Sequence, residues 1–166
     1  MGFYDQEKLK EQMYRAQRDR EAEAEAQTRQ RAEEQRKNQT VCDLVRLAMR
    51  EFPEMAGTFG TRQEKLRVKS KVLSVVIGTR EVRGWYLPDS IFPQAQKDLF
   101  MMDAKNRVYR TSVNGNGFTE EISMEDASKQ IGDRMYAQFC ASGEAFSPEA
   151  VKKRVEEAFR EALKRV

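Results

Sequence analysis

The pattern of apolar and polar positions divides the chain into two parts. The opening stretch is polar, and in the rest of the chain apolar residues recur at the spacing of helices and strands. Between Asp5 and Asn38 almost nothing apolar recurs, and charges of both signs alternate. Glu, Gln, Arg, Lys and Ala dominate this stretch, and Gly and Pro do not occur in it, a composition that favours helix. No apolar heptad repeat continues through it, so it does not predict a long, stable coiled coil. We therefore expect residues 1–40 to form an exposed helical arm.

Large apolar side chains in the arm are confined to its beginning. Leu9 and Met13 are one helical turn apart and fall on the same face of a helix. The apolar and aromatic residues without an evident partner inside the arm are Phe3, Tyr4, Leu9, Met13 and Tyr14. We interpret them as candidate contacts with a protein partner or with a second copy of the chain.

A helix with a continuous apolar face is predicted over residues 41–56. The apolar positions follow the i, i+3, i+4, i+7 spacing of one helix face. They are Val41, Leu44, Val45, Ala48, Phe52 and Met55. Pro53 is expected to kink or end this helix. The arm can run directly into it, and the apolar face would then anchor the inner end of the arm to a core.

The middle of the chain, about residues 68–123, predicts four or five short strands. The β-branched run 68–77 ends at Gly78-Thr79, which we expect to be a hairpin turn with residues 81–87 as the partner strand. Further strands are expected over residues 99–102, 107–113 and 118–122, the last two joined by the Asn-Gly signal at 114–117. Short strands with tight links indicate an antiparallel β-meander.

Two further amphipathic helices are predicted at the end of the chain, over residues 124–141 and 148–166. Ser123 is the expected cap of the first helix, and Ser147 followed by proline is the expected start of the second. The first apolar face consists of Ala127, Ile131, Met135 and Phe139, and the second of Val151, Val155, Phe159, Ala162 and Val166. The order of elements predicts an α+β domain over residues 41–166, with helices covering one face of the sheet.

Composition narrows the chemistry that the chain can perform. The sequence contains no histidine, which excludes Ser-His-Asp and Cys-His nucleophilic sites and histidine-ligated metals. Cys42 and Cys140 are far apart in sequence, and we expect two buried, unreactive thiols rather than a disulfide scaffold or a metal site. We expect no cofactor.

The opening residues lack signal-peptide features and no apolar run is long enough to span a bilayer, so the expected location is the cytoplasm, without a membrane partner.

One segment, residues 62–83, concentrates positive charge, with seven basic and two acidic residues and hence a net charge of 7 − 2 = +5. The basic residues are Arg62, Lys65, Arg67, Lys69, Lys71, Arg80 and Arg83. On a strand, alternate basic residues project from one face, opposite Val68. Such a face can bind a nucleic-acid backbone, with Trp85 or Tyr86 nearby for base stacking, or an acidic protein. A solvated face that protects a strand edge is the favoured interpretation, and we expect Trp85 to be a core residue rather than a stacking residue.

A loose pattern of metal-dependent nucleases is also present. Asp89 and Asp103 could hold Mg²⁺ while Lys105 stabilises an attacking water. The segment 103–106 also fits a type I turn, with Asp103 at a solvent-facing hairpin tip. The turn is the favoured interpretation, so we assign no catalytic residue and no metal ligand.

The sequence as a whole predicts a non-enzymatic protein. We expect protein–protein interaction or assembly through the helical arm. The alternatives are nucleic-acid binding through the basic strand pair 62–83 and, third, a metal-dependent nuclease.

Overall fold

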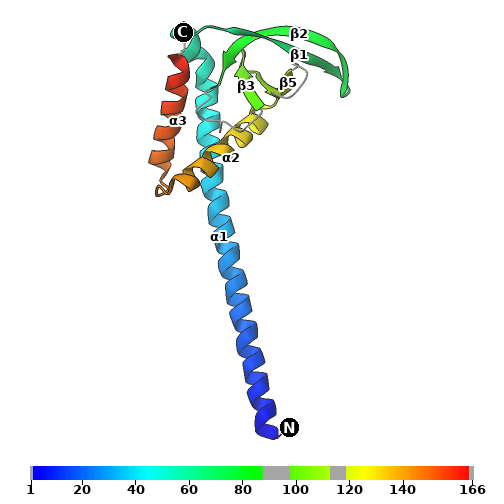
Figure 1. Cartoon of the computed structure of the whole chain (residues 1–166), viewed down its shortest axis with the longest axis vertical. Helices are drawn as coiled ribbons and strands as arrows, with labels where there is room; N and C mark the ends of the chain where they lie inside the picture. Colours follow the sequence, from blue (N-terminus) through cyan, green and yellow to red (C-terminus); the bar gives the residue numbers. More distant parts are fainter. Residues whose placement is uncertain (1, 88–97, 113–118, 165–166) are drawn as a thin grey trace. The chain divides into compact units, whose positions relative to one another are not determined.

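The computed structural model describes residues 2–87, 98–112 and 119–164. The elements in chain order are α1 (Phe3–Thr58), β1 (Glu64–Val72), β2 (Val75–Tyr86), β3 (Asp98–Met102), β4 (Val108–Ser112), β5 (Thr119–Ile122), α2 (Met124–Ser142) and α3 (Pro148–Leu163) (Figure 1). The predicted α+β class is confirmed: a long N-terminal helix, a five-stranded sheet and two further helices. The chain divides into two compact units, Met1–Lys37 and Asn38–Val166.

The first unit is helical from Phe3 onward, and all its residues from Gly2 to Arg36 are exposed. Its ion pairs lie one helical turn apart along the surface. They are Glu11–Arg15 at 2.7 Å, Glu25–Arg29 at 3.9 Å and Glu33–Lys37 at 3.1 Å. Each exposed pair of this kind contributes about 0.3–0.5 kcal/mol. The helix is thus supported by local backbone and side-chain interactions.

The two helices expected over residues 1–40 and 41–56 are parts of one helix, α1. Pro53 does not end it: the residue is buried inside the helix, which continues to Thr58. The apolar face predicted for this part is confirmed, since Val41, Val45 and Phe52 are buried. Within the described residues, no helix combines the length and the apolar character needed to cross a bilayer.

The strands follow one another along the chain as predicted, although the hairpin turn predicted at 114–117 lies outside the described residues. The sheet closes on itself as a barrel in the order β1-β2-β3-β4-β5. Neighbours along the chain pair antiparallel. The closing pair, β1 with β5, is parallel and is made at Val68 and Thr119. A meander predicted from local turn signals says nothing of this closure, because the first and last strands meet only in three dimensions.

The first hairpin turn differs from the prediction at Gly78-Thr79. The chain reverses at Leu73-Ser74, between the paired residues Val72 and Val75, and Gly78 lies inside β2. Leu73 and Ser74 have φ of 49° and 69°, as a two-residue turn between antiparallel strands requires. The sequence showed no turn signal there because neither residue is the glycine or asparagine that such a turn favours.

The main core lies between the helices and one face of the sheet. The predicted faces of α2 and α3 point into it: Ile131 and Met135 on α2, and Val155 and Phe159 on α3, are all buried. Phe100 of β3 joins this core, while the adjacent Met101 turns to the barrel interior. The smaller inner core consists of Val68, Met101 and Tyr109, with Leu66 and Val82 packed against it.

Local interactions fix the ends of the elements. The Ser123 hydroxyl accepts a hydrogen bond from the Asp126 amide at 3.1 Å, which confirms the predicted cap of α2. The Ser147 hydroxyl caps α3 in the same way, accepting from the Ala150 amide at 3.1 Å. Gly143 ends α2 with φ of 72°.

Candidate binding surface of the β1–β2 ribbon

The two longest strands, β1 and β2, form a two-stranded ribbon that begins at the pair Glu64–Gly84 and ends at Val72–Val75. We call residues 64–86 the ribbon. Within the described residues, β5 pairs with β1 only at Val68, and β3 pairs with β2 only at Trp85 and Tyr86. Figure 1 shows the ribbon extending past the shorter strands. Its outer part therefore presents two faces and two edges to its surroundings.

The register separates the two faces of the ribbon, because directly opposed residues share a face. On one face Leu66 lies opposite Val82, and the neighbouring Val68 is buried in the inner core. The other face carries alternate residues of each strand: Lys65 opposite Arg83, Arg67 opposite Glu81 and Lys69 opposite Thr79. We call Lys65, Arg67, Lys69 and Arg83 the cationic face.

Ion pairing divides the seven predicted basic residues. Three have carboxylate partners: Lys65 with Glu81 at 3.6 Å, Lys71 with Glu120 at 3.2 Å and Arg80 with Glu121 at 2.9 Å. The other four, Arg62, Arg67, Lys69 and Arg83, make no ion pair with any residue that the structure describes. No Asp or Glu occurs in the sequence between Lys65 and Arg80. The positive charge of the cationic face is thus only partly neutralised.

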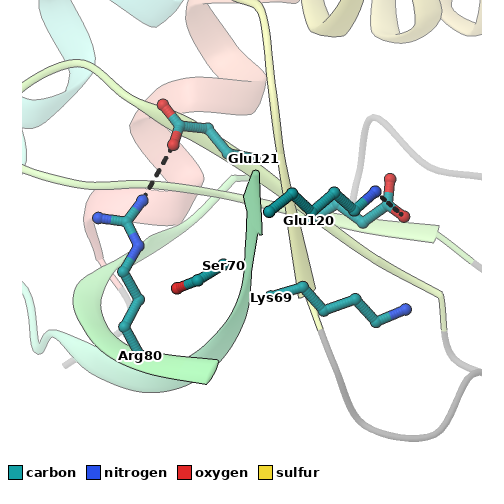
Figure 2. Close-up of a pocket in the computed structure, with 6 residues that line it drawn as sticks. Lys69, Ser70, Arg80, Glu120 and Glu121 are labelled. Atoms are coloured by element: carbon teal, nitrogen blue, oxygen red, sulfur yellow. Dashed lines mark hydrogen bonds and ion pairs between the residues drawn. The ribbon is translucent and has the colours of Figure 1, made fainter. Parts of the chain in front are cut away.

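A cavity of about 330 Å³ lies beside the ribbon, where β1 and β2 approach β5 (Figure 2). Its lining residues are Lys69, Ser70, Lys71, Arg80, Glu120 and Glu121. Three ion pairs occupy its carboxylates, because Glu120 pairs with Lys71 and, at 3.9 Å, with Arg110, and Glu121 pairs with Arg80. Lys69 takes part in none of them (Figure 2). The hydrogen bond and the charge of Lys71 lower the pKa of Glu120 from its ordinary value. Both carboxylates are therefore held by cations. The charge of Lys69 also contributes to lowering the pKa of Glu120, but Lys69 forms no ion pair with either carboxylate.

The end of the ribbon is apolar and exposed. We call Val72, Leu73, Val75, Val76 and Ile77 the apolar tip. All five side chains are at least half exposed, and Leu73 is 95% exposed. This feature differs from the prediction, because a β-branched run resembles a core strand in sequence. One property of the sequence does distinguish the apolar tip from the other apolar runs. No acidic residue lies close to it in the sequence.

The aromatic residues beside the ribbon have different roles. Trp85 is buried in the main core, and its indole N–H donates to the carbonyl oxygen of Thr61 at 2.9 Å. The core role expected for Trp85 is confirmed, and its ring is not open for stacking. A side chain at Gly84 would overlap the backbone of Met102, so the glycine permits close packing of β2 and β3. Tyr86 is exposed.

The candidate partner-binding residues of the arm are exposed, as expected. Phe3 and Tyr4 contact each other edge to face at 6.1 Å, and the Arg18 guanidinium lies 6.0 Å from the Tyr14 ring. Leu9 and Met13 are 49% and 66% exposed. These five side chains have little apolar contact within the first unit.

The nuclease candidates do not form a described site. Asp103 is buried, which contradicts the expected solvent-facing position. Its Oδ1 accepts hydrogen bonds from the amides of Lys105 and Arg107, both at 2.9 Å. Its Oδ2 accepts from Arg107 Nε and from the hydroxyl of Tyr109, both at 3.0 Å. Asp89 lies outside the described residues.

The hydrogen bonds of Asp103 identify it as the organiser of the turn between β3 and β4. Burial and the hydrogen bond to Asp103 raise the pKa of Tyr109 to about 12. In the part of the chain that the structure describes, no three His, Cys, Asp or Glu residues are placed to hold a metal ion. The described geometry supports the turn interpretation of this segment.

The two thiols differ, although both were expected to be buried. Cys42 is buried, but Cys140 is exposed on α2, so the expectation was wrong for Cys140. Burial, followed by the nearby carboxylate of Asp133, raises the pKa of Cys42 to about 11. The Cys42 thiol therefore stays protonated near neutral pH and is a poor nucleophile.

Comparison of the chain with protein-family models, with curated proteins and with solved structures finds no match.

Proposed function

We propose that this chain is a non-enzymatic nucleic-acid-binding protein that contacts phosphates through the cationic face of the ribbon. The observation that carries the proposal is the set of basic side chains on and beside this face without a carboxylate partner: Arg62, Arg67, Lys69 and Arg83. Arg67 and Lys69 project from the same face of β1, two residues apart. A polyanion is the partner whose charge matches such a row.

Phosphate binding by these side chains follows from simple electrostatics. Each cation that neutralises a phosphate releases a condensed counterion, so affinity falls steeply with salt. A two-stranded ribbon also has a size that DNA grooves accept. The net charge of the whole chain is only +3, so the attraction is local to the ribbon. Backbone contacts of this kind bind nucleic acid without reading its sequence.

The test compares the wild type with Arg67→Ala/Lys69→Ala in binding to labelled nucleic acid over a series of salt concentrations. Each phosphate contact contributes about −0.9 to the slope of log K against log salt for duplex DNA, so the variant should lose about two units of slope. The matched control is Lys105→Ala/Lys129→Ala, which removes the same charge from exposed lysines outside the ribbon. Absence of binding at low salt, or an equal loss in the control, would refute the proposal.

A second candidate function is assembly through the arm. The observation that favours it is the exposure of Phe3, Tyr4, Leu9, Met13 and Tyr14 within the first turns of α1. Large apolar side chains gathered on an otherwise polar helix suit contact with another helix. Residues 1–40 have nine basic and nine acidic side chains, so their net charge of 9 − 9 = 0 favours no charged partner. The ribbon indicates its partner's chemistry more closely than the arm does.

A further inference from the structure

We propose that the apolar tip is a wedge that enters the minor groove of duplex DNA, partly unstacks one base step and bends the helix. This inference rests on the proposed nucleic-acid binding and adds to it a site, a kind of nucleic acid and a mechanical effect. Leu73 is the leading side chain of the wedge, with Val72 and Val75 beside it. It is the most exposed of the large hydrophobic side chains in the described part of the chain.

The backbone at the tip is the first observation that carries the inference. Leu73 and Ser74 both lie in the left-handed region, with φ of 49° and 69°. That region suits glycine and asparagine in a two-residue turn and disfavours a leucine. The most exposed large apolar side chain therefore belongs to a residue whose backbone conformation is unfavourable for leucine. Strained residues of this kind cluster at functional positions.

The charges around the apolar tip indicate which kind of molecule it contacts. Between Lys65 and Arg80 the chain has three basic residues, several apolar ones and no acidic one. A second copy that docked tip to tip would bring like charges together, whereas a polyanion would be attracted. The basic residues continue along the ribbon to Lys65 and Arg83, away from the tip. This linear row suits a partner that lies along the ribbon, such as a phosphate backbone. It suits a membrane surface less well, because a membrane would contact the tip and leave the basic residues farther along the ribbon without a partner.

Duplex DNA is the form of nucleic acid that this geometry suits. Minor-groove proteins insert leucine, isoleucine or other apolar wedges between base steps while cations hold the flanking phosphates. The deep, narrow major groove of A-form RNA does not admit side chains, and its minor groove is wide and shallow. A wedge should also favour sites where unstacking costs less, such as flexible pyrimidine–purine steps or mismatches.

The decisive variant is Leu73→Asn/Ser74→Gly, which removes the wedge but supplies the residues that the turn prefers, so the ribbon should fold at least as well. Leu73→Met is the matched control because it keeps a large apolar side chain. Two quantities are measured for each protein, on duplexes of about 30 bp labelled at both ends. One is affinity for a matched and a centrally mismatched duplex, and the other is the end-to-end distance by energy transfer.

The wild type and Leu73→Met should bend the duplex by about 20° or more and bind the mismatched duplex at least about 5-fold more tightly. Leu73→Asn/Ser74→Gly should still bind the matched duplex, within about 3-fold and with an unchanged salt slope, but lose both the bend and the preference.

Two kinds of result would overturn the wedge while leaving the proposed function in place. One is salt-dependent binding, lost in Arg67→Ala/Lys69→Ala, without bending in the wild type. The other is bending that survives in Leu73→Asn/Ser74→Gly. No binding to any duplex would overturn the wedge, and no binding to any duplex or single-stranded nucleic acid at low salt would overturn both proposals. Binding of the tip to anionic vesicles, or a Leu73-dependent increase in solution mass, without DNA bending would assign the tip to a membrane or to a second copy instead and would refute the wedge.

Discussion

At the scale of single residues, Asp103 shows how a buried carboxylate is kept in place. It is 6% exposed, and both oxygens accept hydrogen bonds: two from backbone amides, one from Arg107 and one from Tyr109. A buried ion is tolerated when its hydrogen-bonding capacity is used and a cation lies beside it. The ion pair with Arg107, at 3.0 Å, supplies that charge.

We therefore predict that Asp103→Ala lowers the free energy of unfolding by about 3–5 kcal/mol, because four hydrogen bonds to a charged group are lost and their donors are left unpaired. Tyr109→Phe removes one of the four and should cost about 1.5–3 kcal/mol. Urea denaturation of the full chain measures both values. If the two variants were equally stable, Asp103 would not organise this turn.

At the scale of elements, the contact between α1 and α2 depends on two small residues. A side chain at Gly132 would overlap Cys42, so the glycine allows the helices to approach closely. The Cys42 thiol lies 3.8 Å from Asp133 Oδ1 and 3.9 Å from the carbonyl oxygen of Lys129. Its shortest contact of this kind is with Asn38 Oδ1, at 3.4 Å. The thiol fits there as a neutral donor, whereas a thiolate would face these oxygen atoms without donating to them. Burial is the main cause of its raised pKa, followed by the charge and the hydrogen bond of Asp133.

This arrangement predicts a pH dependence of stability. The pKa of Cys42 is raised from 9.0 to about 11, so between those values the unfolded chain releases its thiol proton while the folded chain keeps it. Stability from this group is complete below pH 9 and is lost as the pH rises to about 11, by an amount on the order of 2 kcal/mol. Denaturation profiles of the wild type and of Cys42→Ala should diverge in that range.

The second cysteine is the natural control for that measurement. Cys140 is exposed, so Cys140→Ala should keep the wild-type pH profile. Loss of the alkaline decline in Cys140→Ala rather than in Cys42→Ala would contradict the assignment.

At the scale of the whole molecule, the first unit and the second unit are stabilised in different ways. The first unit, Met1–Lys37, relies on helix propensity and exposed ion pairs. The second unit, Asn38–Val166, has its own two hydrophobic cores. The apolar side chains near the beginning of α1 belong to neither core, so they are the part of the arm available to another molecule.

For assembly through the arm, we predict that Leu9→Lys/Met13→Lys abolishes self-association. The wild type should have a solution mass above 19.3 kDa by light scattering, and the variant should return to that value. Lysine is a good helix former, so circular dichroism should show unchanged helix content. The control Gln12→Lys/Gln30→Lys adds the same charge to the arm without removing apolar surface. A wild type that is monomeric, or a control that dissociates equally, would exclude self-association through these residues.

Elements with strong periodicity could be predicted from the sequence, and elements defined by long-range pairing could not. The stripes of α2 and α3 and their serine caps follow from spacing and local hydrogen bonding, and the structure confirms them as far as Leu163. Val166, the last predicted member of the α3 stripe, lies outside the described residues. The predicted position of the first hairpin turn was wrong, because Gly78 is the stronger local turn signal. Strand pairing instead places the chain reversal at Leu73 and Ser74. Likewise, the polar type of Asp103 suggested solvent, but its partners Arg107 and Tyr109 allow it to be buried.

The candidate site was predictable in composition but not in arrangement. Residue types and their order are enough to establish that residues 62–83 are strongly basic, that the chain lacks histidine, and that its opening stretch is a polar helix. These properties depend on residue type and local spacing. Only the tertiary structure decided which cations meet carboxylates of β5 and which stay unpaired, and that a β-branched run ends at an exposed apolar tip rather than in a core. Those outcomes depend on which distant strands pair, and pairing is settled by the free energy of the whole barrel.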